Sequence, residues 1–391
     1  MNAFVAVRAL LVRLGFAAGR VLPVRSRVVL GSAHGDRIGG NLAWIRDGIR
    51  RELPDVPIVE LTFWPGGMRT YARAAVHALT SGFHLATARL FVVDDYYFPM
   101  YVVRPRSGTT YVQVWHACGA FKKFGYSVLD KRFGADAAQV QSIPIHSTYH
   151  RCLVSAARFT PAFAEAFRLP AERFTSSLGI PRTDLFFDSD RTAAAVAAVH
   201  GRYSIPAGRR VILYAPTYRA SRMTNARDPL DLDIAALEAV LGGDHVLLLR
   251  SHPFVRERAR LASSTPFAID VSDHPDINEL MLVSDVLVTD YSSAMYEFAL
   301  LGRPMAFFAP DHATYESERG FYFDYVSGVP GPVFTSSDEL ARWLRAGAFD
   351  TERVQRFAAE SFDVADGRAT ARFVDEVVRP ALDPVDRSPI Q

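Results

Sequence analysis

The sequence predicts an α/β protein made of two successive halves, each built on a parallel β-sheet. Short apolar runs rich in Val, Ile and Leu alternate along the chain with segments of helical periodicity. These runs end in polar or glycine-bearing turns, as parallel strands do where they lead into crossover helices. A chain of 391 residues is also long enough to form two domains with full cores.

The first half is expected to contain short strands with helices between them. The strand patterns lie at residues 27–31, 58–61, 90–93, 110–114 and 151–155. The helical patterns lie at residues 42–52, around 71–79 and at 161–167. Parallel strands place their carboxyl ends at one edge of the sheet, which is where open α/β folds bind ligands.

The second half repeats this rhythm. Its strand patterns lie at residues 210–214, 246–249, 268–271, 286–288 and 305–308. Its helical patterns lie at residues 234–241, 277–283 and 351–378, the last interrupted at Asp366-Gly367. A boundary between Asp188 and Ala207, near an alanine-rich helix at 193–199, would separate the halves. We therefore divide the chain into an N-terminal segment (1–27), a first domain (28–200) and a second domain (201–391).

The most informative stretch follows the strand pattern at 286–288. Thr289-Asp290-Tyr291-Ser292-Ser293 leads into a helical pattern that ends at Gly302-Arg303-Pro304. Hydroxyl groups and open backbone N–H groups at the start of a helix can bind a phosphate. We therefore predict a phosphate site at Ser292 and Ser293. The alternative is an ordinary helix cap followed by a solvated Glu297.

A second polar cluster, Trp115-His116, follows the strand pattern at 110–114 and opens a turn that also carries Lys122 and Lys123. His116 could take a proton from an attacking hydroxyl, because the pKa of histidine lies near working pH. Either lysine could hold a phosphate as a point charge. The alternative is a structural histidine that hydrogen-bonds a loop, with both lysines solvated.

Two more clusters lie at strand ends in the second half. Thr217 and Arg219 follow the strand pattern at 210–214 and could contact a phosphate or a ribose, although a proline-initiated turn is the better explanation when this cluster is taken alone. His252 follows the strand pattern at 246–249 and could donate a hydrogen bond to a phosphoryl oxygen, or serve structure alone. Four such clusters in two successive α/β halves together favour the functional interpretation.

These clusters share the chemistry of anion capture. Lysine, arginine, histidine and helix-start hydroxyls predominate, and no acidic pair is spaced for a divalent metal. The sequence has no G-x-x-x-x-G-K-[ST] motif, no G-x-S-x-G and no H-E-x-x-H, and residues 31–35 lack a convincing G-x-G-x-x-G. We therefore expect phosphate binding without a metal, a cofactor, a P-loop or the usual dinucleotide site.

The overall charge limits the range of partners. The formal net charge is only +2, so bulk charge predicts no nucleic-acid partner. The two cysteines, Cys118 and Cys152, are too few for a disulfide framework and favour a reducing compartment.

The N-terminal segment is apolar but interrupted by Arg8, Arg13 and Arg20, so it holds no uncharged span of membrane-crossing length. It also lacks the small-residue cleavage site of a signal peptide. Two interpretations remain: a basic amphipathic helix on an anionic membrane surface, or an ordinary helix packed on the first domain.

Several blocks of the sequence together resemble one known family. The blocks are G-S-A-H-G-D-R-I-G-G-N (31–41), W-H-A-C-G-A-F-K-K-F-G (115–125), G-I-P-R-T-D (179–184), Y-A-P-T-Y-R (214–219), R-S-H-P (250–253), D-I-N-E-L-M-L-V-S-D-V-L-V-T-D-Y-S-S (276–293), F-A-L-L-G-R-P (298–304), R-G-F-Y-F-D-Y (319–325), G-P-V (331–333) and D-G-R-A-T (366–370). The chain resembles the CDP-glycerol glycerophosphotransferases of teichoic acid synthesis, which include primases and glycerol- and ribitol-phosphate polymerases. The resemblance extends from about Val28 to Val378.

The resemblance implies a GT-B fold, in which two Rossmann-like domains face each other across a cleft. The second domain would bind CDP-glycerol or CDP-ribitol, and the first would carry the acceptor side. An acceptor hydroxyl would attack the phosphorus that bears the alcohol, and CMP would leave. By similarity, His116 would be the base for that hydroxyl, and His252 would stabilise the pyrophosphate or the leaving CMP.

The resemblance also assigns the remaining site residues. The donor-binding set would be Lys123, Thr217, Arg219, Asp290, Ser292, Ser293 and Glu297. Within it, the two serines would hold the pyrophosphate, and Glu297 would lie near the ribose or the cytidine. The acceptor would be a lipid-linked saccharide or a growing wall or capsular polyol-phosphate polymer at the cytoplasmic face of the membrane, where the protein would be peripheral.

Two other functions remain open on the sequence. A GT-B glycosyltransferase that uses a nucleotide sugar would share the phosphate site at the strand ends. A nucleotide- or lipid-binding protein could keep the same fold without turnover. The choice between glycerol and ribitol, and between priming and polymerisation, is not fixed by the residues.

Overall fold

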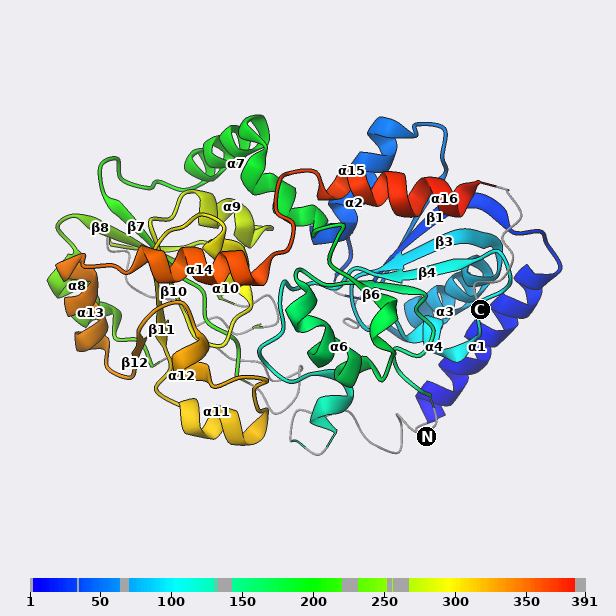
Figure 1. Cartoon of the computed structure of the whole chain (residues 1–391), viewed down its shortest axis with the longest axis horizontal. Coiled ribbons are helices and arrows are strands. Elements are labelled where there is room, and N and C mark those ends of the chain that lie inside the picture. Colours follow the sequence, from blue (N-terminus) through cyan, green and yellow to red (C-terminus); the bar gives the residue numbers. More distant parts are fainter. Residues whose placement is uncertain are drawn as a thin grey trace.

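The computed structural model describes residues 3–33, 35–63, 70–129, 131, 143–219, 231–251, 255 and 267–383. The chain folds into two α/β halves side by side, with the first half on the right of Figure 1 and the second half on the left. Each half is built on a six-stranded sheet whose neighbouring strands all run parallel. The predicted α/β class with parallel sheets is therefore correct.

The first half contains the strands β1 (Arg25–Ser32), β2 (Ile58–Thr62), β3 (Ala88–Val93), β4 (Thr110–Gln113), β5 (Arg151–Leu153) and β6 (Phe174–Thr175). Its α-helices are α1 (Ala3–Arg20), α2 (Gly40–Glu52), α3 (Thr70–Thr87), α4 (Phe98–Val102) and α6 (Thr160–Phe167). Short 3₁₀ helices occur at Gly125–Val128, Ala157–Phe159, Ala171–Arg173 and Pro181–Phe187.

The second half contains the strands β7 (Arg210–Tyr214), β8 (His245–Leu249), β9 (Ala268–Asp270), β10 (Val286–Thr289), β11 (Met305–Phe308) and β12 (Val333–Phe334). Its helices are α7 (Ser189–Arg202), α8 (Ile234–Leu241), α9 (Ile277–Leu282), α10 (Ala294–Ala299), α11 (His312–Glu318), α12 (Tyr325–Gly328), α13 (Ser337–Ala346) and α14 (Thr351–Ser361). The chain ends in α15 (Ala369–Phe373), a π-helical turn (Val374–Val378) and α16 (Arg379–Leu382).

The order of the strands defines a switch point in each sheet. The first sheet has the order β2-β1-β3-β4-β5-β6, so the order reverses between β1 and β3. The second has the order β12-β11-β10-β7-β8-β9, so the order reverses between β7 and β10. Ligands of open α/β sheets bind beyond the carboxyl ends of the strands at such points. The segments that follow β1 and β3 in the first sheet, and β7 and β10 in the second, are therefore the first place to look for a site.

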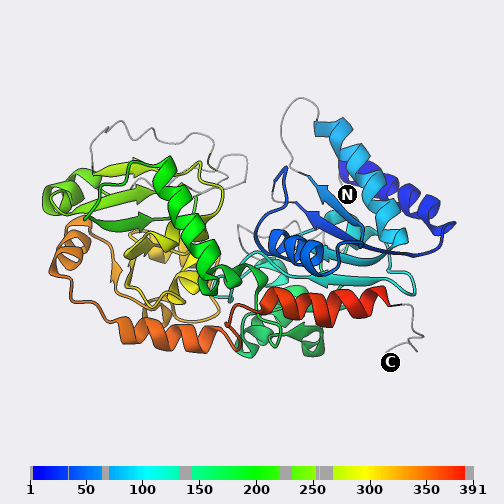
Figure 2. The same cartoon turned by 90° about the horizontal axis from the view of Figure 1, so that it is seen from above.

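The C-terminal helices return to the first half. α15 contacts α2, and α16 contacts β3. The carboxylate of Asp184 accepts hydrogen bonds from the backbone N–H groups of Ala369 (2.9 Å) and Thr370 (2.8 Å), which begin α15. Figures 1 and 2 both show this red segment alongside the first half. The motifs 179–184 and 366–370 thus meet in space, although the domain division at 200 placed them in different domains.

The N-terminal helix packs along α3 at the outer end of the first half (Figure 2). The two backbones approach closely, because a Cβ atom at Gly15 would overlap the carbonyl of Leu79 and one at Gly82 would overlap the carbonyl of Val12. Arg8 turns into the protein, where its guanidinium lies 4.9 Å from the ring centroid of Phe63. Only Arg13 and Arg20, of the three arginines that interrupt this segment, are exposed.

Candidate active site

The turn after β4, which carries His116, has a strained backbone at Trp115. Trp115 has a φ of +53°, which costs a non-glycine residue about 1 kcal/mol or more. Three hydrogen bonds hold this turn: the amide group of Asn41 donates to the carbonyls of Val114 (3.1 Å) and Trp115 (2.9 Å), and the side-chain oxygen of Gln113 accepts from the Trp115 N–H (2.8 Å). The strain is thus fixed by neighbouring structure, as is common at functional sites.

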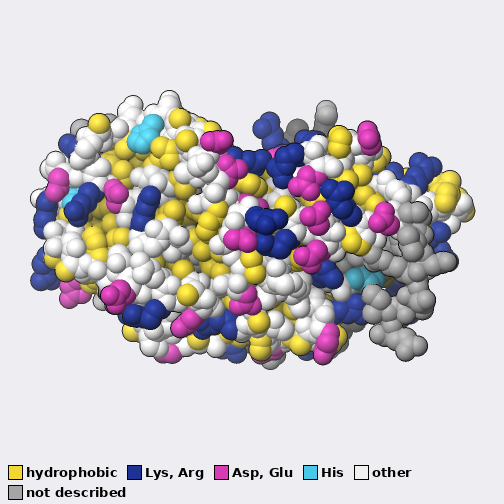
Figure 3. Space-filling model, turned by 45° about the horizontal axis from the view of Figure 1, so that its top comes forward, with side chains coloured by type: hydrophobic (Ala, Val, Ile, Leu, Met, Phe, Trp, Pro, Cys, Tyr) yellow, Lys and Arg dark blue, Asp and Glu magenta, His cyan; other side chains and the backbone are white. Residues whose placement is uncertain are grey.

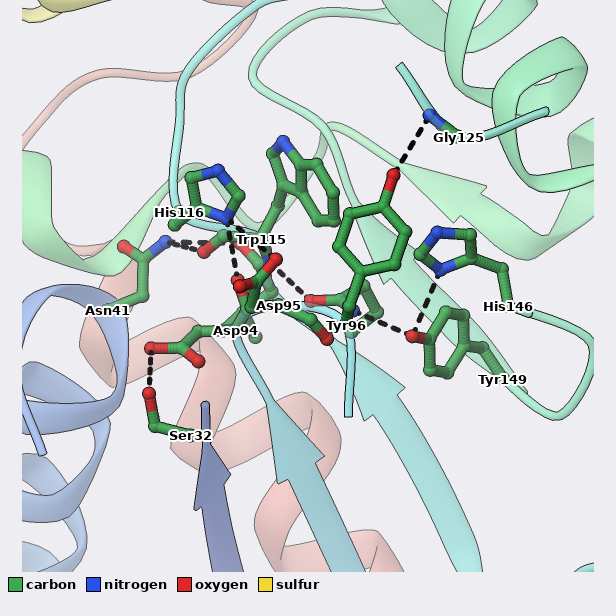
Figure 4. A network of polar contacts seen from close by, with 12 residues as sticks. Ser32, Asn41, Asp94, Asp95, Tyr96, Trp115, His116, Gly125, His146 and Tyr149 are labelled. Atoms are coloured by element: carbon green, nitrogen blue, oxygen red, sulfur yellow. Dashed lines mark hydrogen bonds and ion pairs between the residues drawn. The ribbon is translucent and has the colours of Figure 1, made fainter. Parts of the chain in front are cut away.

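The imidazole of His116 is oriented by the segment that follows β3. Its Nδ1 lies 3.1 Å from the carbonyl oxygen of Asp94 and 3.5 Å from Oδ1 of Asp95 (Figure 4). Two acceptors around Nδ1 favour the tautomer that has its proton on Nδ1 and its lone pair on Nε2. About a third of the side chain (37%) is exposed to solvent. This orientation and exposure are compatible with the predicted role of His116 as a base.

On the second half, a buried ion pair joins the turns that follow β7 and β10. The carboxylate of Asp290 is 1% exposed and accepts from the Thr217 N–H (2.7 Å), the Tyr291 N–H (2.5 Å) and the Arg219 guanidinium (2.8 Å). Arg219 also forms two hydrogen bonds with Asp311, at 2.6 and 3.0 Å. Burial would lower the pKa of Arg219, but these carboxylates outweigh it and raise that pKa above its usual range. These bonds hold the two turns at the second switch point in a fixed relative position.

Two of the predicted donor-binding residues carry buried polar atoms that lack a partner. Within the described part of the chain, neither Oγ1 of Thr217 nor Oε2 of Glu297 has a hydrogen-bond partner. Leaving such an atom unsatisfied costs about 1–3 kcal/mol, so polar atoms of this kind typically meet a ligand or an ordered water. Ser292 and Ser293 stand between them in sequence and are half-buried, and Oγ of Ser292 accepts from the Ala294 N–H (3.3 Å).

The two halves meet through the His116 turn itself. The carbonyl of Phe121 accepts from the Tyr322 N–H (2.7 Å), and the Lys123 N–H donates to the carbonyl of Gly320 (3.0 Å). The rings of Phe121 and Phe321 are stacked, with centroids 5.8 Å apart. The family-like blocks 115–125 and 319–325 are therefore a pair of segments that bind each other across the interface.

The two lysines of this turn have different surroundings. Lys123, the predicted donor-binding lysine, runs alongside Gly320. Burial and the positive charges of Arg319 and Arg219 lower the pKa of Lys122 to about 7, and Asp290 opposes that shift. The charges of Arg219 and Asp290 at the second switch point therefore act on Lys122. The donor-binding role of Lys123 remains a prediction.

His252 lies outside the described residues. The two residues before it are described. Arg250 donates to the carbonyl of Ser272, and the Ser251 N–H donates to Oγ of Ser272 (2.9 Å), so the segment after β8 is tied to the end of β9. The predicted role of His252 remains a prediction.

The sequence interpretation did not single out Asn41, Asp95 or Arg182. Asp95 belongs to an acidic pair directly after a strand, which is a local signal that could have marked it. Asn41 and Arg182 stand in blocks that were noted for their resemblance, but their contacts with the His116 turn are long-range. The Arg182 guanidinium donates to the carbonyl of His116 (2.6 Å) and forms an ion pair with Glu297. Glu297 was predicted to lie near the ribose or the cytidine. Its Oε1 pairs with Arg182, and its Oε2 is the oxygen that has no partner among the described residues.

Among the described residues, no three His, Cys, Asp or Glu side chains are grouped so that they could hold a metal ion. None of the described helices combines the length and apolar character needed to cross a bilayer. Basic and acidic side chains are interspersed on the face shown in Figure 3, without a broad field of one sign. This agrees with the small net charge of +2.

Comparison with known proteins now decides the family. The family model described as CDP-glycerol:poly(glycerophosphate) glycerophosphotransferase matches residues 16–379. The chain belongs to this family. The predicted resemblance is confirmed, and the chain is a transferase of the glycerophosphotransferase type.

Two relatives show how far the similarity extends. A teichoic acid ribitol-phosphate primase of Bacillus spizizenii is 37% identical over 362 residues, which cover 91% of this chain and 92% of that protein. A teichoic acid poly(ribitol-phosphate) polymerase of the same species is 33% identical, and the match covers 94% of this chain and 59% of the polymerase.

A solved structure confirms the predicted GT-B fold. The wall teichoic acid polymerase TagF superposes with a TM-score of 0.79 at 24% identity, over 96% of this chain and 94% of the TagF chain. At this identity the likeness establishes the arrangement of the two Rossmann-like domains. The roles of individual residues have to be argued from the chain itself.

Proposed function

We propose that this glycerophosphotransferase moves glycerol phosphate or ribitol phosphate from a CDP-alcohol to a hydroxyl group of a lipid-linked saccharide or polyol-phosphate polymer. The observation that carries the proposal is the contact between the His116 turn of the first half and segments of the second half that follow the second switch point. The turn that holds His116 lies directly against the segments that carry Tyr296, Glu297 and Phe321. The proposed base of the first half and the proposed phosphate site of the second half would thus share one interface.

The chemistry follows from this arrangement. The acceptor oxygen forms a bond to the phosphorus that bears the alcohol, and the bond from that phosphorus to the oxygen of CMP breaks. Nε2 of His116 takes the proton of the attacking hydroxyl, while Asp94 and Asp95 hold Nδ1. Positive charge near the leaving group stabilises the departing CMP, as phosphoryl transfer generally requires. Lys122 and the predicted His252 would supply it.

The donor pocket is proposed to form at the second switch point. Oγ1 of Thr217 and Oε2 of Glu297 would gain the partners that they lack among the described residues. The hydroxyls of Ser292 and Ser293 would hold the diphosphate, with Lys123 at the rim. Asp290 and Arg219 already bind each other, so their contribution would be to fix the two turns that line the pocket.

CMP release measures this function directly. The purified chain would be given CDP-ribitol, CDP-glycerol and a panel of UDP-sugars, with a synthetic lipid-linked acceptor. CDP-ribitol is the first donor to test, because the 37% identical relative is named a ribitol-phosphate primase. We expect CMP release with a CDP-alcohol and its loss in His116→Ala and in His252→Ala. His200→Ala, an exposed histidine of α7, is the matched control and should retain full turnover.

Other outcomes would change the assignment. Turnover of UDP-sugars alone would make the chain a nucleotide-sugar glycosyltransferase. Nucleotide binding without CMP release under any acceptor would make it a binding protein. Wild-type turnover in both His116→Ala and His252→Ala would refute the assigned roles. The length of the product, read by mass spectrometry, separates priming from polymerisation.

The protein is further proposed to attach to the cytoplasmic face of the membrane through α1 and α3. Their outer face exposes large apolar side chains, namely Phe4, Val7, Leu10, Leu14, Tyr71, Val76 and Leu79. Arg13 and Arg20 are exposed beside this apolar surface. An apolar face flanked by arginines suits the boundary of an anionic bilayer, where a lipid-linked acceptor would be found. This supports the membrane-surface interpretation of the N-terminal segment.

Vesicle flotation tests this attachment. The wild-type chain should float with vesicles that contain anionic lipid, and the double variant Leu10→Glu/Leu14→Glu should stay at the bottom of the gradient. Val326→Glu is the control, because Val326 on α12 is as exposed (53%) as Leu10 (53%) and Leu14 (52%). Equal flotation of the double variant and the wild type would refute the assigned surface.

A further inference from the structure

Arg182, a residue of the first half, pairs with a donor-side carboxylate and also contacts the His116 turn. It stands at the start of the 3₁₀ helix Pro181–Phe187, and its backbone N–H donates to the side-chain oxygen of Asn41 (3.0 Å). Asn41 in turn holds the carbonyls of Val114 and Trp115. The backbone of Arg182 is thus bonded to Asn41, the same residue that holds the strained turn.

The guanidinium of Arg182 contacts groups of both halves. Nη1 donates to the carbonyl of His116 (2.6 Å), and Nη2 pairs with Oε1 of Glu297 on α10. Burial raises the pKa of the Cys118 thiol in the same turn, and the nearby charge of Arg182 opposes that shift. One planar group therefore joins the peptide carbonyl of His116 to a carboxylate of the other half, and a fork-shaped donor suits such multiple contacts.

This connection is buried, which makes it stiff. The side chain of Arg182 is 16% exposed and that of Glu297 is 1% exposed. Removing one member of such a pair leaves an uncompensated buried charge, whereas a surface pair contributes little. Tyr296, the neighbour of Glu297, packs its ring against Gly119 of the same turn. Helix α10 and the turn are therefore joined by two buried contacts.

We propose that Arg182 is a positioning residue: through its ion pair with the donor-side residue Glu297, it sets the place of His116 according to the position of helix α10. The inference rests on the proposed function, because the diphosphate would bind at Ser292 and Ser293, directly before α10. When the donor settles that segment, Glu297 moves with it, and Arg182 passes the displacement to the peptide carbonyl of His116. The base is then aligned with the acceptor hydroxyl when a donor is bound.

The closing experiment separates positioning from binding and from folding. Arg182→Gln and Glu297→Gln are compared for kcat, for KM of the CDP-alcohol, for donor affinity by calorimetry and for thermal stability. We expect kcat to fall about 10- to 100-fold in Arg182→Gln, since a misplacement of about 1 Å costs this much, while donor affinity stays within a factor of about three. Arg182→Lys keeps the charge without the fork and should lose most of the same kcat.

The double variant and a matched control complete the test. Arg182→Gln/Glu297→Gln should be no slower than Arg182→Gln alone, because the two residues act as one unit. Arg158→Gln removes an ion pair to Glu360, which also joins the two halves but is exposed at both ends (48% and 63%), and should keep wild-type kcat. The Lys variant keeps the test decisive if the Gln variants fold poorly.

Failure of the inference can be told from failure of the proposed function. The wild-type chain is assayed first, and absence of CMP release with every CDP-alcohol would refute the function, and the inference with it. If the wild type is active, wild-type kcat in the folded Arg182→Lys or Arg182→Gln would refute the inference alone. So would losses of kcat that are fully additive in the double variant.

Discussion

The ring of Tyr296 lies against the α-carbon of Gly119, at the place where the two halves of the protein meet. Gly119 has a φ of +63°, and a Cβ atom built on it would overlap the ring atoms of Tyr296. The glycine is therefore required twice: by the left-handed backbone and by the approach of α10 to the His116 turn. Replacing this residue therefore tests whether the protein needs the close contact between Tyr296 and the His116 turn.

We expect Gly119→Ala to lower turnover by at least tenfold and to destabilise the protein, since the added methyl group must displace Tyr296 or the turn. The measurements are CMP release and the midpoint of urea unfolding. Gly243→Ala is the control: Gly243 is exposed, and an added Cβ atom would meet nothing within 4 Å. Unchanged turnover and stability in Gly119→Ala would show that the interface adapts to an added methyl group.

A second prediction concerns the buried carboxylate of Asp290. Asp290→Asn removes the charge that Arg219 and the two backbone N–H groups of Thr217 and Tyr291 share. Breaking a buried pair from one side typically costs about 3–5 kcal/mol, and Asp311, which remains, should keep the loss near the lower end. Denaturant unfolding measures the free energy of unfolding. A loss below about 1 kcal/mol would contradict the structural role given to this carboxylate.

The strands and the places of the polar clusters could be read from the sequence because both depend on local pattern. The strand patterns at 210–214 and 286–288 match β7 and β10, and Thr217 and Asp290 follow them as expected. Parallel strands bring their carboxyl ends together, so residues that are far apart in sequence could be placed at one edge without knowing any contact. That reasoning located the His116 turn and the second switch point.

The contacts between the halves could not be read in this way. Glu297 follows Ser293 in a helical pattern, which suggested a solvated or ligand-binding side chain, but its carboxylate pairs with Arg182, 115 residues away. The return of α15 to α2 likewise depends on the packing of Thr370 against Gly48, and no local period reports it. Long-range pairs are chosen by shape and charge at an interface, and a single sequence does not encode their partners in any periodic form.

A third prediction uses the lowered pKa of Lys122, which is about 7. Above this pH the ammonium loses its proton in the unliganded enzyme, and a bound diphosphate would favour the protonated form. Donor binding should therefore take up a proton, and the Kd for the CDP-alcohol should rise by up to about tenfold per pH unit between pH 7 and pH 9. Calorimetry in buffers of different ionisation enthalpy measures both the affinity and the proton uptake.

The same pKa has a consequence for stability. The folded pKa of Lys122 lies below its usual value of 10.5, so the unfolded chain binds more protons between about pH 7 and pH 10. The contribution of Lys122 to the free energy of unfolding therefore rises with pH in this window. The arginine in Lys122→Arg does not titrate in this range. The variant should therefore reduce the pH dependence of both the donor Kd and the free energy of unfolding. If both keep their wild-type pH dependence, Lys122 is not the group that titrates.

The last prediction concerns Asp95, whose Oδ1 lies 3.5 Å from Nδ1 of His116. In Asp95→Asn the amide group can donate to Nδ1, which would move the imidazole proton to Nε2 and remove the lone pair that the acceptor hydroxyl needs. The carbonyl of Asp94 still accepts from Nδ1 and opposes this exchange. We therefore expect kcat to fall about 10- to 100-fold, as for other partners that orient a reactive histidine, with no change in donor Kd. Asp95→Ala removes the carboxylate without adding a donor and should be less impaired than Asp95→Asn. If Asp95→Ala were the slower of the two, Asp95 would act through its charge, rather than by fixing the tautomer of His116.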